Sequence, residues 1–240
     1  MTYKELINEV LIRLREDTIA TDWSGAINDN TNVSAYHKVI GSLINDAKRG
    51  VEERHDWLNL RETVDISTVA STKNYNLSSG QEIKILDAIN NDTGLHLHQV
   101  SKQYINTVKY PTDDTGEPLY YAFNGSDASN NLKVDLSPVP TEAHTISFDV
   151  VKYQDKLTSA ATVLKVPAQP VILGAWARAI AERGEDGGTQ SSLMAQEANE
   201  ALKQAIILDS GNTKYESDWF VNENHSSQYA TGLNLSLIHI

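Results

Sequence analysis

The sequence predicts an α+β protein in which two helix pairs, one N-terminal and one C-terminal, form a four-helix bundle that carries an inserted antiparallel β-sandwich or barrel-like domain. Apolar residues recur at helical spacing over residues 1–59 and again over 168–208, whereas they alternate with polar residues over 60–167. Each helix pair alone would expose its apolar stripe, and the other pair can cover that stripe. Residues 209–240 follow as an extended C-terminal tail.

Charge and composition narrow the classes of function. The chain has 20 Lys and Arg residues against 32 Asp and Glu residues, a formal net charge of −12. Because phosphate binding depends on clustered Lys and Arg, this balance argues against a protein that grips nucleic acid. An acidic surface suits solubility, or a channel wall along which DNA slides. The absence of cysteine excludes disulfides and thiolate chemistry. No apolar run approaches the roughly 20 residues that span a bilayer, so no membrane association is expected.

The first helix pair has clear start signals. Thr2 and Glu5 have capping-box spacing, in which each side chain satisfies a free backbone N–H. An apolar stripe follows, and the helix is expected to end near Asp17. After a polar loop, Ser34 is a candidate N-cap for a second helix that keeps the helical period to about His55.

The apolar period changes to two from Leu60 onward, which predicts strands. A short helical spacing over 104–108 interrupts the alternation, and Asn124-Gly125 is a strong hairpin-turn signal. About seven or eight short strands between turns favour the sandwich or barrel-like arrangement. The clean alternation indicates that one face of each strand meets water.

The second helix pair is a helix–turn–helix hairpin. Pro170 fits the first turn of a helix, where its missing N–H costs nothing. Gly184 is placed for a left-handed C-cap, and Thr189 can cap the next helix. The residues of that last helix expected to face inward are Leu193, Ala198, Ala201, Leu202, Ala205 and Ile206.

The tail carries aromatic side chains without a continuous period. They are Tyr215, Trp219, Phe220 and Tyr229. Such a segment either docks on a partner subunit or stays disordered. The last six residues, 235–240, look like the translation of a transposase mosaic-end adapter, so we expect them to be an artefact of sequencing rather than the natural C-terminus.

Candidate catalytic and metal-binding residues are few. His96 and His98 have the alternate spacing of paired metal ligands on a strand, with Asp87 and Asp92 as further candidates. A complete ligand set is missing nearby, which favours surface residues over a metal site. No Gly-x-Ser-x-Gly, Gly-Lys-Ser/Thr or His-Glu-x-x-His motif occurs. We therefore expect no catalysis, no cofactor and no metal.

The densest basic group lies on the second helix. It comprises Lys48, Arg49 and Arg54, with acidic residues interleaved and Arg61 just beyond. This pattern favours an ion-paired exposed face or a subunit interface over a nucleic-acid site.

The helical segments resemble a known family. They are Thr-Tyr-Lys-Glu-Leu-Ile-Asn-Glu-Val-Leu-Ile-Arg-Leu (2–14), Val-Ile-Gly-Ser-Leu-Ile-Asn-Asp-Ala-Lys-Arg-Gly-Val-Glu (39–52) and the run from Pro170 to Gly188 with its Ala-rich continuation. In sequence and in their order around a β region, they resemble the head-to-tail adaptor proteins of tailed bacteriophages, also called connectors or tail tubular protein A.

The resemblance implies a structural virion protein made in the host bacterial cytoplasm and located in the neck of the virion. It implies a homo-oligomeric ring, commonly a dodecamer, between the portal protein and the tail nozzle or tail tube protein, through which DNA passes without specific binding. The expected portal or subunit contacts are Lys48, Arg49, Arg54, Tyr215, Trp219, Phe220 and Tyr229.

Two other classes of function remain open at the level of sequence. A β-sandwich module on a helical stalk would bind carbohydrate or a receptor through a platform of Tyr110, Tyr120 and Tyr121. A metal-dependent hydrolase would use His96 and His98.

Overall fold

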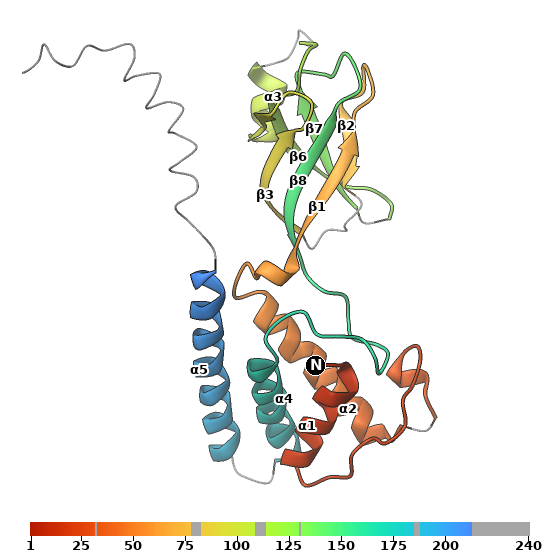
Figure 1. The fold of residues 1–240 in the computed structure, drawn as a ribbon, viewed down its shortest axis with the longest axis vertical. Helices are drawn as coiled ribbons and strands as arrows, with labels where there is room; N and C mark the ends of the chain where they lie inside the picture. Colours follow the sequence, from red (N-terminus) through yellow and green to blue (C-terminus); the bar gives the residue numbers. More distant parts are fainter. Residues whose placement is uncertain (32, 78–82, 109–113, 130, 185–187, 213–240) are drawn as a thin grey trace, which may run out of the picture.

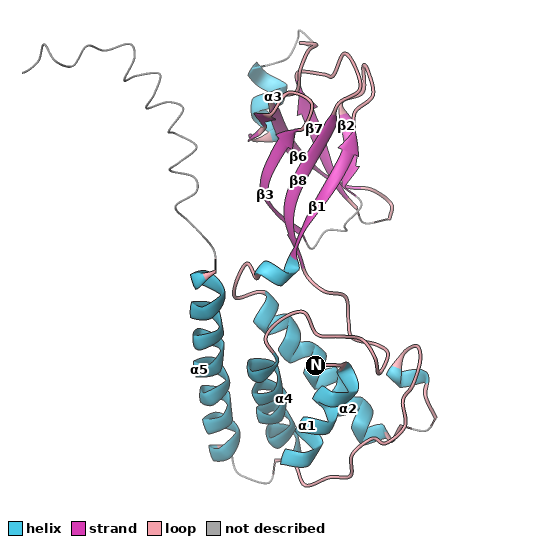
Figure 2. Ribbon diagram, in the orientation of Figure 1, coloured by secondary structure: helices cyan, strands magenta, loops and turns pink. Residues whose placement is uncertain are grey.

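The structure, a computed structural model, has a helical part at one end and a β part at the other (Figures 1 and 2). It describes residues 1–31, 33–77, 83–108, 114–129, 131–184 and 188–212. The chain crosses between the two parts twice, through residues 53–60 and again through 153–167. Each part has its own cluster of buried apolar side chains. The predicted α+β class is confirmed.

The helical part contains four of the helices. They are α1 (Tyr3–Arg13), α2 (Ala35–Glu52), α4 (Ala168–Arg183) and α5 (Thr189–Gly211). Helix α4 packs against the other three, whereas α5 packs mainly against α4 and forms one edge of the helical part (Figure 1). The position of α4 therefore decides where α5 lies.

The predicted starts of α1 and α2 are confirmed, but both helices end earlier than expected. The Thr2 N–H donates to Glu5 Oε2 at 2.8 Å and Thr2 Oγ1 accepts from the Glu5 N–H at 3.3 Å, and Ser34 caps α2. Helix α1 ends at Arg13 rather than near Asp17, because Arg15 takes a left-handed φ of 57° that a right-handed helix cannot continue.

The end of α2 has a different cause. The Trp57 indole N–H donates to the Val51 carbonyl at 2.9 Å and thereby occupies a carbonyl of the last turn. Helix α2 therefore ends at Glu52, three residues before the predicted end at about His55, because this carbonyl bonds to a side chain instead of continuing the helix.

The α4–α5 hairpin departs from the prediction in two respects. Gly184 takes the predicted left-handed conformation with φ 67°, but the N-cap of α5 is Gly188 rather than Thr189. Leu193 was expected to face inward and is instead 53% exposed, while Met194 is buried. Met194 lies two turns from the buried Leu202, so these two residues share the face that meets α4.

The β part consists of two four-stranded sheets. The first has the order β1 (Arg61–Ser67), β8 (Thr145–Lys152), β3 (Ile83–Asn90) and β4 (Leu95–His96). The second has the order β2 (Asn74–Leu77), β7 (Leu132–Ser137), β6 (Tyr120–Ser126) and β5 (His98–Gln99). One apolar cluster draws side chains from both sheets, as where the Tyr121 and Phe148 rings meet edge to face at 5.4 Å.

One strand pair departs from the expected antiparallel pattern. Strand β5 pairs with β6 in parallel, because the chain between them passes through helix α3 (Lys102–Val108) before it returns to the same sheet. The other strand pairs of the described residues are antiparallel. The described strands form no closed barrel.

Tyr3 forms the central contact between α1 and α2. Its hydroxyl accepts a hydrogen bond from Asn45 Nδ2 at 3.2 Å, and its ring meets Trp23 edge to face at 5.9 Å. A Cβ added at Gly41 would lie only 2.5 Å from the Tyr3 hydroxyl oxygen, so a glycine is required at that position. Burial raises the pKa of Tyr3 well above its ordinary value of 10.0, against the smaller opposite effect of the Asn45 bond.

This raised pKa predicts alkaline destabilisation. In the unfolded chain Tyr3 ionises near its ordinary pKa, so its contribution to stability is complete below that pH and is lost as pH rises above it. The free energy of unfolding of the wild type relative to Tyr3→Phe should fall by about 1.4 kcal/mol per pH unit above about pH 10. Urea unfolding of both proteins at about pH 9 and about pH 11 measures this, and a difference that stays constant would contradict it.

Candidate interaction surfaces

The two histidines proposed as metal ligands lie on different strands, and only His96 contacts another candidate ligand, Asp87. His96 lies on β4 of the first sheet and His98 on β5 of the second, separated by the buried Leu97. His96 Nδ1 is 2.9 Å from Asp87 Oδ2, and the His98 ring lies 6.3 Å from that of Tyr120. The expectation that the two histidines share one face of a strand is therefore wrong.

Neither a metal cluster nor a membrane span is found in the described residues. They contain no group of three or more His, Cys, Asp or Glu side chains that could hold a metal ion. None of the described helices is both long and apolar enough to cross a membrane.

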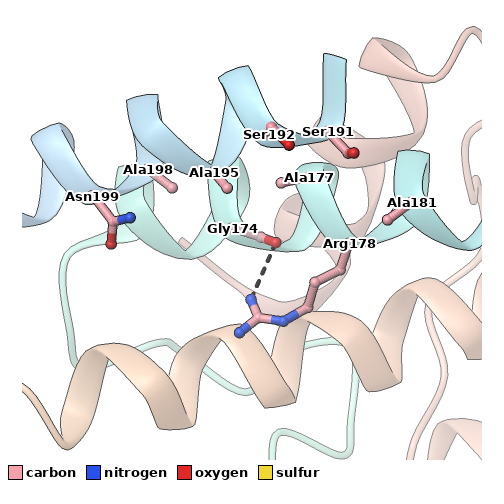
Figure 3. Close-up of a pocket in the computed structure, with 9 residues that line it drawn as sticks. All are labelled: Gly174, Ala177, Arg178, Ala181, Ser191, Ser192, Ala195, Ala198 and Asn199. Carbon is pink, nitrogen blue, oxygen red and sulfur yellow. Dashed lines mark hydrogen bonds between the residues drawn. The ribbon is translucent and has the colours of Figure 1, made fainter. Parts of the chain in front are cut away.

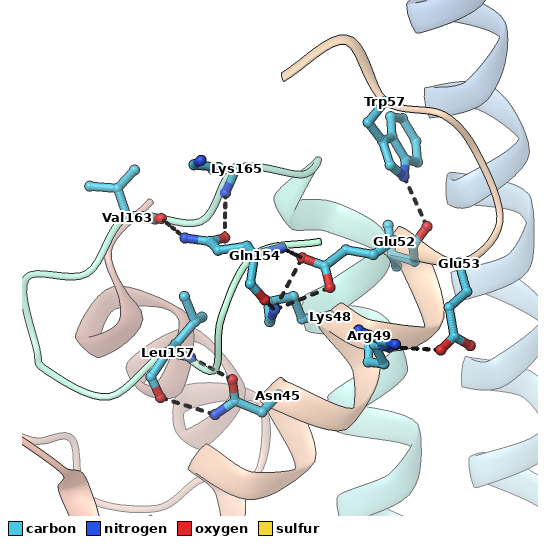
Figure 4. Close-up of polar contacts among 11 residues, drawn as sticks. Asn45, Lys48, Arg49, Glu52, Glu53, Trp57, Gln154, Leu157, Val163 and Lys165 are labelled. Atoms are coloured by element: carbon cyan, nitrogen blue, oxygen red, sulfur yellow. Dashed lines mark hydrogen bonds and ion pairs between the residues drawn. The ribbon is translucent and has the colours of Figure 1, made fainter. Parts of the chain in front are cut away.

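A buried ion pair on α2 fixes the second crossing between the two parts (Figure 4). Lys48 and Glu52 are 2% and 0% exposed, and Lys48 Nζ lies 3.0 Å from Glu52 Oε1. Lys48 Nζ also donates to the Gln154 carbonyl, and the Gln154 N–H donates to Glu52 Oε1 at 3.2 Å. Burial raises the pKa of Glu52, and the Lys48 ammonium opposes that shift.

Two amides extend this contact along the crossing segment. The Asn45 side chain accepts from the Leu157 N–H at 2.8 Å and donates to the Leu157 carbonyl at 3.1 Å. The Gln154 side chain donates to the Val163 carbonyl at 2.7 Å and accepts from the Lys165 N–H at 3.0 Å (Figure 4). Segment 154–165 is therefore folded on itself and bonded to α2.

The first crossing is bonded to the end of α5. Asp209 Oδ2 accepts from the Leu58 N–H at 3.2 Å and lies 3.0 Å from His55 Nε2. Lys84 of β3 forms an ion pair with Asp56 in the same crossing. The sequence did not reveal the roles of Asn45, Gln154 and Asp209. For Asn45, a polar residue on an otherwise buried face of α2 was a usable signal.

The basic group predicted to be an interface divides into two kinds of residue. Lys48 is bonded inside the subunit, as described above, and has no surface to offer a partner. The Arg49 guanidinium lies over the Tyr153 ring at 4.4 Å, and its Nε is 2.7 Å from Glu53 Oε1. Arg54 is exposed.

The other four predicted contacts, Tyr215, Trp219, Phe220 and Tyr229, lie outside the described residues, as does the adapter-like segment 235–240.

Of the aromatic residues of the alternative carbohydrate site, Tyr121 is buried between the sheets. Tyr121 is 4% exposed and belongs to the apolar cluster between the sheets, so the prediction that it stacks on a sugar is wrong. Tyr120 is half-buried beside Tyr104, with ring centroids 6.0 Å apart. Tyr110 lies outside the described residues.

A shallow groove of about 450 Å³ runs between α4 and α5 (Figure 3). Its small lining residues are Gly174, Ala177, Ala181, Ala195 and Ala198. Arg178 lies beside it and donates from Nη1 to the Gly174 carbonyl at 3.1 Å, with its guanidinium pointing toward α2. The groove holds no catalytic grouping and is a candidate surface for another protein.

The buried ion pair predicts a large difference between single and double substitutions. Lys48→Met leaves Glu52 buried without its cation and should cost about 3–5 kcal/mol of stability in urea unfolding. Lys48→Met combined with Glu52→Leu removes both charges and should recover most of that loss. Lys203→Met is the matched control, because its ion pair with Glu200 is exposed and contributes less than about 1 kcal/mol. A double variant less stable than the single one would contradict the prediction.

Comparison with known proteins identifies the family. No curated protein matches the chain significantly. The model of the SU10 adaptor protein family, however, matches residues 1–219. This match covers both helix pairs and the β part between them. The chain therefore belongs to the SU10 adaptor protein family, a family of phage head-to-tail adaptors.

Proposed function

We propose that this protein forms a homo-oligomeric ring, a dodecamer, that joins the portal protein to the tail nozzle or tail tube protein in the neck of the virion. The observation that carries the proposal is the family match over residues 1–219, which includes both parts of the fold. The helical part builds the wall of the ring, and the ring acts without catalysis or a cofactor.

The charge of the chain supports a role as part of the DNA channel. With a net charge of −12, a ring of many copies carries a large negative charge. Phosphates are repelled by such a wall, so DNA passes through the ring without being held.

The proposed contacts with the portal and with neighbouring subunits are Arg49, Arg54 and the aromatic residues of the tail. Arg54 is exposed, and the Arg49 side chain remains 34% exposed beside Tyr153. Aromatic and arginine side chains are the residue types that contribute most to protein interfaces. Lys48 is omitted because its ammonium is bonded inside the subunit.

Electron microscopy of the purified chain mixed with the portal protein of the same phage tests the proposal. We expect an additional ring layer on one face of the portal, with several copies of the chain per portal. Particles that remain monomeric and leave the portal unchanged would contradict it.

The tail aromatics give a second prediction. Trp219→Ala combined with Phe220→Ala should weaken portal binding at least about tenfold, because two large apolar anchors are removed. Surface plasmon resonance with immobilised portal measures the affinity. Tyr104→Ala removes an aromatic side chain that is 37% exposed on the β part and serves as the matched control. Equal losses in the two proteins would argue against a specific role for the tail.

A further inference from the structure

Helix α5 exposes large aliphatic side chains on the face that points away from its own subunit. Leu193 is 53% and Ile207 is 70% exposed. Glu200 lies midway between them at a spacing of seven residues, which places all three on one face of the helix. Leu208 is 73% exposed at the border of that face, and Glu197 lies beside Glu200. We call these five residues the α5 ridge.

A second surface, formed by α2 and α4, combines glycines with two arginines. A Cβ added at Gly50 would lie 3.9 Å from Nη2 of Arg178, so this guanidinium rests against the bare backbone of α2. Arg54 lies two residues beyond the end of α2, in the turn that follows it, and is exposed. We call Gly50, Arg54, Gly174 and Arg178, with the adjoining α4–α5 groove, the arginine face. Figure 3 shows Gly174, Arg178 and the groove.

Within the part of the chain that the structure describes, neither arginine has a carboxylate partner. Among the ion pairs of the described residues, none involves Arg54 or Arg178, and Arg178 donates only to the carbonyl of Gly174 in its own helix. The exposed Asp46 lies one turn before Gly50 and faces the same way along α2, but forms no such pair. Among the described residues, this face therefore offers two guanidinium groups that no carboxylate of the same copy binds.

The two surfaces carry opposite charges, and these charges lie at the same level along the helix axes. The Arg178 guanidinium reaches back to Gly174, which lines the groove together with Ala198 of α5. Glu197 and Glu200 flank Ala198 in sequence. A second copy displaced sideways, without sliding along the helix axes, therefore brings its ridge carboxylates level with this guanidinium.

We propose that the α5 ridge of one copy packs on the arginine face of the next copy. Glu197 and Glu200 face Arg178 and Arg54, and the ridge aliphatics cover the small-residue groove. Because the two surfaces differ, the contact is heterologous and can repeat around a closed ring. This inference rests on the proposed ring and names the surfaces that build it.

A charge-reversal cycle in the full chain tests the pairing. Arg54→Glu with Arg178→Glu, and separately Glu197→Arg with Glu200→Arg, should each reduce the fraction of ring at least about tenfold, because like charges then meet at the contact. The chain that carries all four substitutions should recover the ring. Light scattering after size exclusion, with and without portal, measures the fraction. Arg61→Glu and Glu142→Lys reverse exposed charges of the β part and should leave it unchanged.

Disulfide trapping gives an independent readout that does not depend on charge. The chain contains no cysteine, so single cysteines can be placed without background. Ala181 lines the groove beside Ser192, the neighbour of Leu193 in sequence. Differently tagged Ala181→Cys and Leu193→Cys chains, mixed and oxidised, should form a mixed disulfide dimer. Val69→Cys, at a 60% exposed position of the β part, should not link to Leu193→Cys.

The outcomes separate this inference from the function on which it rests. Rings that persist in both charge-reversed variants, or a missing Ala181–Leu193 disulfide, would overturn the proposed contact while the portal-joining function stands. A Leu193→Cys chain that links to the portal instead would give the ridge a different occupant and would also overturn it. Wild-type chains that never join a portal would overturn the function itself.

Discussion

The arrangement of the subunit depends on the buried contact between α2 and the segment that leads from β8 to α4. Two chain crossings join the helical and β parts, and such connections leave the parts free to move unless side chains fix them. Lys48 and Glu52 fix one crossing by bonding both the carbonyl and the N–H of Gln154. A buried ion pair stabilises little by itself, because desolvation opposes the Coulomb attraction. Its value here is positional, since both charges, besides bonding to each other, bond to the backbone of the same residue, Gln154.

The position of the outer helix follows from this contact. Segment 154–165 is held on α2 and continues directly into α4, which packs against α1, α2 and α5. Helix α5 touches the remainder mainly through α4, with Asp209 bonded to the first crossing at its far end. The orientation of the α5 outer face is thus set by its packing on α4 and by the bonds of Asp209 to the first crossing.

The sequence predicted the helix caps that depend on local spacing. It did not predict the burial of side chains whose partners are distant in the sequence. Capping by Thr2 and Ser34 and the left-handed Gly184 follow from local chemistry, and all three are confirmed. The burial of Lys48 could not be read locally, because its partner Gln154 lies 106 residues away. Leu193 and Met194 are adjacent apolar residues in a helix rich in alanine, so the period alone could not decide which one faces α4. The alternation around His96 and His98 could not show that the chain passes there from one sheet to the other, because β4 and β5 have only two residues each.

The cations of this acidic chain serve two different purposes, and the difference bears on assembly. Lys48 is enclosed and satisfied within the subunit, whereas Arg54 and Arg178 have no carboxylate partner among the described residues. A cation of the first kind determines the shape of one copy, and cations of the second kind are available to another copy. The end of α5 is held in a similar way. Asp209 bonds to the first crossing and so keeps the C-terminal end of α5, up to the C-cap Asn212, beside it. In a ring built through the α5 ridge, every tail would start at the same height, on the side of the β part, so that many weak tail contacts can act together on one portal.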